Sequence, residues 1–411
     1  MTTVNANARS AAFLAVGCLA VAGTLVGQLG ATSAATYASD GNGGVTSGLF
    51  LALFLVTSSV SATWTPRLAA RWGGLRCFAW AQLFVAVSWT MVGVIEASTN
   101  SSLAVLLVAA HFLGLLSGLT AVLTPFITRS YIDPHSLSSS LAKRSAVSGV
   151  AAMIGAVVGG FLIHATDPGI GILANGLLTI PLALFTFLVQ PREIPAPVHS
   201  SGHPLRDVLV TLRTSKKVRP LLVLAVVQAI FVAPIMMMIV PILKDLDHAP
   251  LPSGAGLVLA GGAAGRLLVP YLVSRLLRKR QELAAALSVY PWLVGCMLAF
   301  GATALLPLSD FDLVLWTLIG FGLGATRFTI RPLIMTASTK AGAKGDEMAG
   351  LTAVITLGVF VSPVGPLVWG FMIEYLTAPV TLVTFALAGA TVTGLLAHQL
   401  KSPENQNRAR S

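Results

Sequence analysis

The sequence predicts an all-α integral membrane protein in which twelve transmembrane helices form two six-helix repeats around a central cavity. Three observations lead to this fold class: the composition, a regular series of apolar segments, and the placement of the basic residues. Of the 411 residues, 55% are hydrophobic and only 10% are charged. Soluble domains carry about 25% charged residues, so this much apolar surface requires a bilayer as its solvent.

Twelve apolar segments are long enough, at about 20 residues each, to cross a bilayer as helices. In the first half they are residues 11–31, 45–64, 77–95, 103–127, 146–164 and 170–188. In the second half they are residues 221–242, 254–276, 283–306, 313–335, 350–373 and 380–396. The longest polar stretch, residues 190–220, contains several prolines and a basic run. It predicts a cytoplasmic linker between a bundle at 1–189 and a bundle at 221–398, followed by a cytoplasmic tail at 399–411.

The basic residues predict the orientation of the chain. With a cytoplasmic N-terminus, Lys244 alone falls in an outside loop, and three arginines (Arg266, Arg327 and Arg331) fall within predicted helices. All the other Lys and Arg residues then lie on the cytoplasmic side. This is the positive-inside pattern of a cell inner membrane protein with both termini in the cytoplasm. The net charge of +11 therefore reflects contact with membrane lipid, and we expect no nucleic-acid partner.

The sequence predicts neither an enzyme nor a metal site. Cys18, Cys77 and Cys296 are far apart in apolar stretches, and neither a P-loop nor a Gly-x-Ser-x-Gly elbow occurs. Gly320-Phe-Gly322-Leu-Gly324 lies inside a predicted helix, so we expect close helix packing there rather than a dinucleotide site. We expect no cofactor, a small-molecule substrate as partner, and a chain that acts as a monomer.

Matching segments in the two halves predict an internal repeat. Residues 66–76 align with residues 270–280 at a shift of 204 residues. The shared residues are Pro66 and Pro270, Leu68 and Leu272, Arg71 and Arg275, and Arg76 and Arg280. Residues 155–164 align with residues 365–374 at a shift of 210. Two matches at similar shifts favour parallel six-helix repeats over chance similarity among apolar segments, which is the alternative.

Together these features resemble the major facilitator superfamily, and the resemblance covers essentially the whole chain. In that family the turn after the second helix typically reads Gly-x-Leu-Ala-Asp-Arg-x-Gly-Arg-Arg, and Arg71, Gly73 and Arg76 fit it. The aspartate position of the motif is Ala70 here and Ser274 in the second half. The resemblance implies a secondary active transporter that works by alternating access between two matched halves.

Further segments resemble exporters of this family. Gly155-Ala-Val-Val-Gly-Gly160 resembles the antiporter motif Gly-Pro-x-x-Gly-Gly, with alanine in place of the proline. Leu205-Arg-Asp, Arg219-Pro-Leu-Leu and Pro241 resemble the branch of multidrug, macrolide and siderophore exporters. These resemblances imply proton-coupled efflux of a bulky organic compound by an antiporter, as in multidrug resistance. Import of an anionic metabolite is the alternative within transport, and an integral-membrane transferase is the alternative outside it.

The missing aspartates change what we expect of the cytoplasmic latch. The resemblance implies that the two basic turns take part in gating, yet neither turn supplies its own carboxylate. We therefore expect carboxylates elsewhere on the cytoplasmic side to pair with Arg71 and Arg275. The expected gating residues are Arg71, Arg76, Arg275, Arg280, Asp133, Asp346 and Glu347.

Buried arginines are the main candidates for a substrate site. Arg266 lies about 12 residues, or about 18 Å, into its predicted helix, close to the bilayer midplane. An ionised group at that depth is costly, so Arg266 either binds an anionic group in the cavity or hydrogen-bonds backbone carbonyls between helices. Arg327 is a second candidate for the cavity wall. Arg331 lies one turn further along the same helical face and is expected to extend to the cytoplasmic surface.

Three other residues complete the candidate list. His111 is a candidate for proton coupling, with a neutral histidine bonded to a neighbouring helix as the alternative. Gln28 is a candidate substrate contact or a packing contact. Met237, one of three consecutive methionines, suits a bulky organic substrate or ordinary core packing. Because no Asp or Glu lies in the middle of a predicted span, we expect a neutral, zwitterionic or anionic substrate rather than a lipophilic cation.

The predicted topology is testable with reporter fusions. Fusions after Arg76, within residues 190–220 and after Arg280 should report the cytoplasm, because these segments carry the positive charge. Fusions near Asp40 and Asp247 should report the outside. An outside signal from the linker would contradict the twelve-helix topology.

Overall fold

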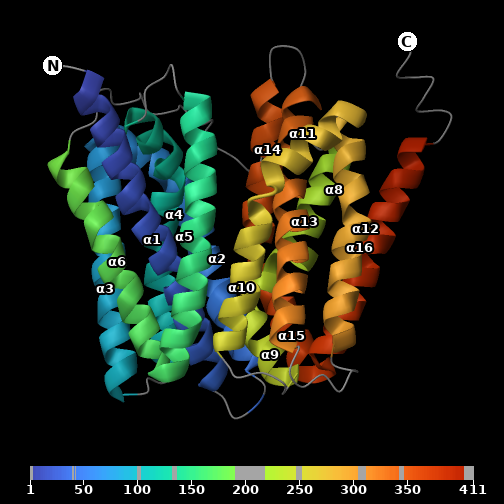
Figure 1. Ribbon diagram of the computed structural model, residues 1–411, viewed down its shortest axis with the longest axis horizontal. Coiled ribbons are helices and arrows are strands. Elements are labelled where there is room, and N and C mark those ends of the chain that lie inside the picture. The colour runs from blue at the N-terminus through green and yellow to red at the C-terminus, as the bar shows by residue number, and fades with distance from the viewer. Residues whose placement is uncertain are drawn as a thin grey trace.

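The structure of the protein is a computed structural model that describes residues 3–38, 41, 43–99, 103–131, 137–189, 218–246, 252–303, 312–341 and 347–401. Its regular elements in these ranges are helices. Most of the predicted linker, residues 190–217, and most of the predicted tail, residues 402–411, lie outside the described ranges. Figure 1 shows the helices side by side in one bundle, with α1–α6 beside α8–α16.

Six long helices make up the first half. They are α1 (Thr3–Tyr37), α2 (Gly44–Trp72), α3 (Gly74–Thr99), α4 (Leu103–Tyr131), α5 (Leu137–Ala165) and α6 (Pro168–Leu188). α1 packs between α5 and α6, α3 packs on α6, and α4 packs on α2 and α3. α2 and α3 are joined by Gly73 alone, whose φ of 86° is a left-handed conformation that favours glycine.

The second half is built from shorter and more broken helices. They are α8 (Arg219–Val227), the π-helical turn η2 (Gln228–Val232), the 3-10 turn η3 (Ala233–Met236), α9 (Ile239–Leu246), α10 (Ser253–Arg266), α11 (Val269–Lys279), α12 (Glu282–Ala302), α13 (Asp312–Ala341), α14 (Glu347–Val361), α15 (Val364–Leu376) and α16 (Ala378–Lys401). α13 packs on α10 and α12, and α16 packs on α12.

The helices agree with the predicted membrane fold. Ten of the described helices are long and apolar enough to cross a membrane, and α10 with α11 makes an eleventh span as one bent pair. α13 is 30 residues long, or about 45 Å, which is ample for a twelfth crossing. α1 begins and α16 ends at the same end of the bundle (Figure 1), as an even number of crossings requires.

Three spans that the sequence predicted as continuous are interrupted. The seventh passes through a π-helical and a 3-10 turn around Pro234. The eighth bends by 46° between α10 and α11, where Pro270 occupies the first turn of α11. The eleventh breaks at Pro363, between α14 and α15. A proline removes a backbone donor and clashes with the preceding turn, which accounts for the position of each interruption.

The two halves contact each other near the end of the bundle opposite the start of α1. We call this the outer end, because the basic residues predict that it faces outward. There α10 packs against α5 and α15 packs against α2. A Cβ added to Gly160 of α5 would lie 2.9 Å from the Cα of Gly256 in α10, and one added to Gly48 of α2 would lie 2.6 Å from the carbonyl oxygen of Pro366. Backbones approach this closely only where side chains are absent.

Paired glycines also hold α10 against α13. A Cβ on Gly261 or Gly265 of α10 would overlap the carbonyl oxygens of Thr317 and Phe321 in α13. A Cβ on Gly324 of α13 would in turn overlap the carbonyl oxygen of Gly262. The prediction that the glycines at 320–324 serve close helix packing is therefore confirmed. Small residues spaced four apart let two membrane helices reach backbone contact, where van der Waals packing is strongest.

A glycine-to-alanine substitution at two different positions distinguishes the effect of this packing on stability from the effect of helix propensity. Gly265→Ala should lower the melting temperature in detergent, because overpacking a tight contact costs about 1–3 kcal/mol. Gly295→Ala in α12 should leave it unchanged or raise it, since nothing lies within 4 Å of a Cβ there and alanine is the better helix former. A Gly265→Ala protein as stable as the parent would contradict the backbone contact.

Candidate substrate site and outer contact

The α10–α13 contact brings two of the predicted site residues together. Arg266 directly follows Gly265 at the end of α10, and Arg327 follows Gly324 by three residues on α13. The guanidinium carbon of Arg266 lies 5.1 Å from the centre of the Phe328 ring, and that of Arg327 lies 5.4 Å from it. One aromatic ring thus serves two cations, each within the distance of a cation–π interaction.

This arginine pair has little compensation from the protein. Among the described residues, no hydrogen bond or ion pair joins either guanidinium to a partner. Both side chains are half-buried, and Arg331 is exposed one turn further along α13, as its predicted extension to the surface requires. Arg331 is close enough to both arginines to repel them electrostatically. The local field is therefore strongly positive and suited to an anion.

No carboxylate is placed to neutralise the pair from the middle of a helix. The acidic residues inside the described ranges all lie at helix ends. They are Glu96, Asp167, Asp245, Glu282, Asp312, Glu347 and Glu374. Within the described ranges, no Asp or Glu therefore lies in the middle of a helix, as the sequence analysis expected.

Among the described residues, no interaction joins the other predicted substrate contacts to the arginine pair. Gln28 is half-buried in α1, where its backbone carbonyl oxygen accepts a hydrogen bond from the Thr32 hydroxyl at 2.7 Å. Met237 is half-buried and packs against the hydrophobic core, between the buried Met236 and Met238. His111 is exposed on α4, with its ring centre 5.8 Å from that of Phe112. The roles of these residues stay predictions.

The predicted gating pairs are placed only in part. Arg71 and Arg76 are exposed at the ends of α2 and α3 that meet at Gly73, and Arg280 is exposed after α11. Arg275 donates to the Tyr271 hydroxyl of its own helix at 3.3 Å. Asp133 and Asp346 lie outside the described residues, and only the backbone of Glu347, the first residue of α14, is described. Pairing of these groups across the cytoplasmic face stays a prediction.

The broken seventh span contains a polar group that the sequence analysis missed. Gln228 begins the π-helical turn η2, and its Oε1 atom is buried with no hydrogen-bond partner in the described structure. π-Helical turns and unsatisfied buried polar atoms are both common at functional sites. A glutamine six residues before Pro234 in an otherwise apolar span was the signal available in the sequence.

A second missed feature is a polar contact at the outer end. The backbone N–H of Gly44, at the start of α2, donates to Oε2 of Glu374 in α15 at 3.0 Å. Lys244 of α9 donates to the carbonyl oxygen of Gly41 at 2.7 Å and to that of Thr36 at 3.3 Å. Both charged side chains belong to the second half, and all three partners are backbone groups of the first half. We call this set the outer contact.

The outer contact joins the halves more firmly than apolar packing alone. Its hydrogen bonds are charge-assisted, and each is worth about 1.5–3 kcal/mol when shielded from water and less when part-exposed. In the middle of the bundle, Ser59 of α2 donates to the carbonyl oxygen of Val359 in α14 at 3.0 Å. The protein in this state is therefore closed by contacts at its outer end.

Comparison with solved structures places the architecture among membrane transporters. The nucleoside transporter NupG superposes with a TM-score of 0.71 at 12% identity, over 96% of this chain and 99% of that chain. The xylose transporter XylE from E. coli gives 0.71 at 11% identity, over 95% of each chain. The human organic anion transporter MFSD10 (TETRAN) gives 0.61 at 18% identity, over 96% of this chain and 100% of that chain. At these identities the likeness establishes the shared fold.

Two packed halves built from helices long and apolar enough to cross a membrane are typical of a membrane transporter. The sequence model of the Major Facilitator Superfamily matches residues 8–363. The chain belongs to the Major Facilitator Superfamily. No curated protein sequence matches it, and its resemblance to the exporter branch stays a prediction.

Removing the Glu374 carboxylate should open the outer end. Loss of one part-exposed charge-assisted hydrogen bond, about 1–2 kcal/mol, should shift the balance of the two states about tenfold towards the outward-open form. The measurement is the distance distribution between spin labels at Thr99→Cys and Ala302→Cys, exposed at the outer ends of the two halves, with the native cysteines replaced.

Glu374→Ala should add a longer distance to this distribution. Glu282→Ala, which removes a carboxylate at the opposite end of α12, is the control and should leave it unchanged. Identical distributions for both variants and the parent would contradict a latch at the outer contact.

Proposed function

We propose that this Major Facilitator Superfamily transporter moves a bulky organic compound that carries an anionic group, and that Arg266 and Arg327 bind that group. The observation that carries the proposal is the pair of guanidinium groups on Phe328 without a carboxylate among the described residues. A zwitterionic substrate is compatible with the same pair, because one anionic group is sufficient to bind it.

Magnitudes favour a bound anion over a purely structural role. A charged side chain near the bilayer centre costs about 2.5–3.5 kcal/mol on insertion scales and more in simulations. A cation–π contact returns about 1–2 kcal/mol, and here two cations share one ring while Arg331 repels both. The remaining cost is reduced by water in a cavity or by an anionic ligand, and a guanidinium fork matches carboxylate and phosphate geometry.

For direction and coupling we propose proton-coupled efflux, with His111 as the proton-coupling residue. This part of the proposal is supported by the resemblance of the 155–160 segment to an antiporter motif and by the ability of an imidazole ring to accept and donate a proton. Import of an anionic metabolite is the alternative direction, and it uses the same binding pair. Transport measured with the pH gradient imposed in each direction distinguishes the two.

Variants of Arg266 test the proposed binding group. The probe is a set of compounds with one scaffold that carries a carboxylate, an amide or an amine, screened by melting temperature and then by uptake into proteoliposomes. The carboxylate member should bind best to the parent protein. Arg266→Gln should weaken its binding about 10- to 100-fold at an unchanged melting temperature, because a charged hydrogen-bond partner is lost. Arg266→Lys should have an intermediate effect, mainly on KM.

Arg278→Gln, an exposed charge on α11, is the matched control and should behave like the parent. Two outcomes contradict the proposal. One is an Arg266→Gln protein that is less stable but transports normally, which would make the arginine structural. The other is a panel in which only the amine binds.

A further inference from the structure

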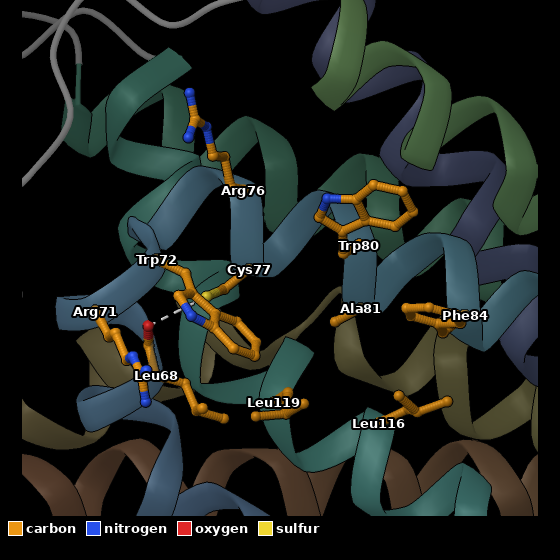
Figure 2. A pocket seen from close by; sticks show the side chains of 10 residues that line it. All are labelled: Leu68, Arg71, Trp72, Arg76, Cys77, Trp80, Ala81, Phe84, Leu116 and Leu119. Atoms are coloured by element: carbon orange, nitrogen blue, oxygen red, sulfur yellow. Dashed lines mark hydrogen bonds between the residues drawn. The ribbon is translucent and has the colours of Figure 1, made fainter.

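A pocket on the first half lies away from the route between the two halves. Its volume is about 590 Å³, within the range of roughly 300–1,000 Å³ of small-molecule sites. It is bounded by α2, α3 and α4 of one half (Figure 2). The residues that line it are Leu68, Arg71, Trp72, Arg76, Cys77, Trp80, Ala81, Phe84, Leu116 and Leu119.

The pocket is polar at one end and apolar at the other. Figure 2 shows Phe84 and Leu116 at the right, Arg71 at the lower left and Arg76 at the top, with the two arginine side chains pointing away from each other. Both arginines flank the Gly73 turn, at the end of the bundle where α1 begins (Figure 1). Phe84 lies ten residues beyond Gly74 on α3, which is about 15 Å deeper along the helix. The charged end is thus at the depth of lipid headgroups, and the apolar end reaches the acyl chains.

The aromatic walls face outward from the protein. The side chains of Trp72, Trp80 and Phe84 are 59%, 51% and 52% exposed. On a membrane helix, such surfaces contact lipid, and tryptophan is enriched where headgroups meet hydrocarbon. A ligand held here would contact the bilayer along its length, which suits a lipid better than a transported solute.

The charge of the pocket selects the kind of lipid. Among the described residues, its lining contains two arginines and no acidic residue, and the aspartate position of the family motif is Ala70 here. No hydrogen bond or ion pair to another described residue occupies either guanidinium. A guanidinium binds phosphate oxygens through two parallel N–H donors. In a zwitterionic lipid the ammonium group of the headgroup weakens this attraction, whereas an anionic lipid has no such group.

We propose that this pocket binds one anionic phospholipid, with its phosphate at the end of the pocket that carries Arg71 and Arg76 and an acyl chain along Trp80, Phe84 and Leu119. The lipid holds the α2–α3 turn by charge at one end and by apolar contact at the other.

Native mass spectrometry of the purified full chain in mild detergent tests the site. The probes are phosphatidylglycerol and phosphatidylethanolamine with identical acyl chains, added in equal amounts. One phosphatidylglycerol should be retained in preference to phosphatidylethanolamine by about tenfold, since each arginine near the surface adds several-fold to anionic lipid binding. Soluble glycerol phosphate should not displace it, because the acyl chain contributes to binding.

Two different variants separate a built site from general positive charge. Arg71→Gln with Arg76→Gln should remove the preference for phosphatidylglycerol. Leu119→Trp keeps both arginines but fills the apolar end, and should lower retention of the lipid about as much. Arg275→Gln with Arg280→Gln removes the equivalent charges of the second repeat and should leave the preference for phosphatidylglycerol as it is in the parent. Melting temperatures show which variants remain folded.

Several results would overturn the proposal. Equal retention of the two lipids by the parent would remove the charge selection. An equal loss of lipid preference in the Arg275→Gln/Arg280→Gln control would show that the preference depends only on the net charge of the protein. Full retention by a folded Leu119→Trp protein would place the lipid outside the pocket, and displacement by glycerol phosphate would identify a phosphate site instead of a lipid site.

Discussion

The close packing of α10 against α13 determines where the buried charge of this protein lies. Gly261 and Gly265 remove side chains from one face of α10, and Gly324 does the same for α13, so that backbone meets backbone. In a bilayer, helices gain no hydrophobic energy by associating, and such contacts are a main source of stability. Because Arg266 and Arg327 follow these glycines within one turn, the contact that holds the half together also brings two cations to the ring of Phe328.

The arginine pair and the outer contact both bear on the free-energy difference between the two states of alternating access. The outer contact uses Glu374 and Lys244 of one half on backbone groups of the other, and its hydrogen bonds favour the state described here. A ligand shifts such an equilibrium only by the difference in its affinity for the two states. An anion bound by Arg266 and Arg327 offsets the repulsion that Arg331 exerts on both, so it shifts the balance only by the difference in its affinity for the two states.

Composition and local pattern predicted the membrane fold and the glycine packing at 320–324, because each depends on the chain's own sequence and on the bilayer. The outer contact was not predictable, since Gly44 and Glu374 are 330 residues apart and meet only through packing of the halves. The pocket beside Arg71 was also not predictable from the sequence. Lipid and protein interior are both apolar, so a membrane helix carries little periodicity to show which face is buried. The break in the seventh span was not predicted, nor was the position of Gln228 in a π-helical turn, with a side-chain oxygen that is buried and unpaired among the described residues.

The two repeats show why a family motif predicts charge better than contacts. Arg71 and Arg76 align with Arg275 and Arg280, and the positive-inside bias alone is sufficient to keep basic residues at both turns. Their surroundings differ. Gly73 turns α2 directly into α3 with a positive φ, whereas α11 ends in extended backbone at Arg280. Arg275 donates to Tyr271, while the residue aligned with Tyr271 in the first half is Arg67, which repels rather than accepts. The first turn therefore leaves its arginines available to an external anion, and the second engages one of them internally.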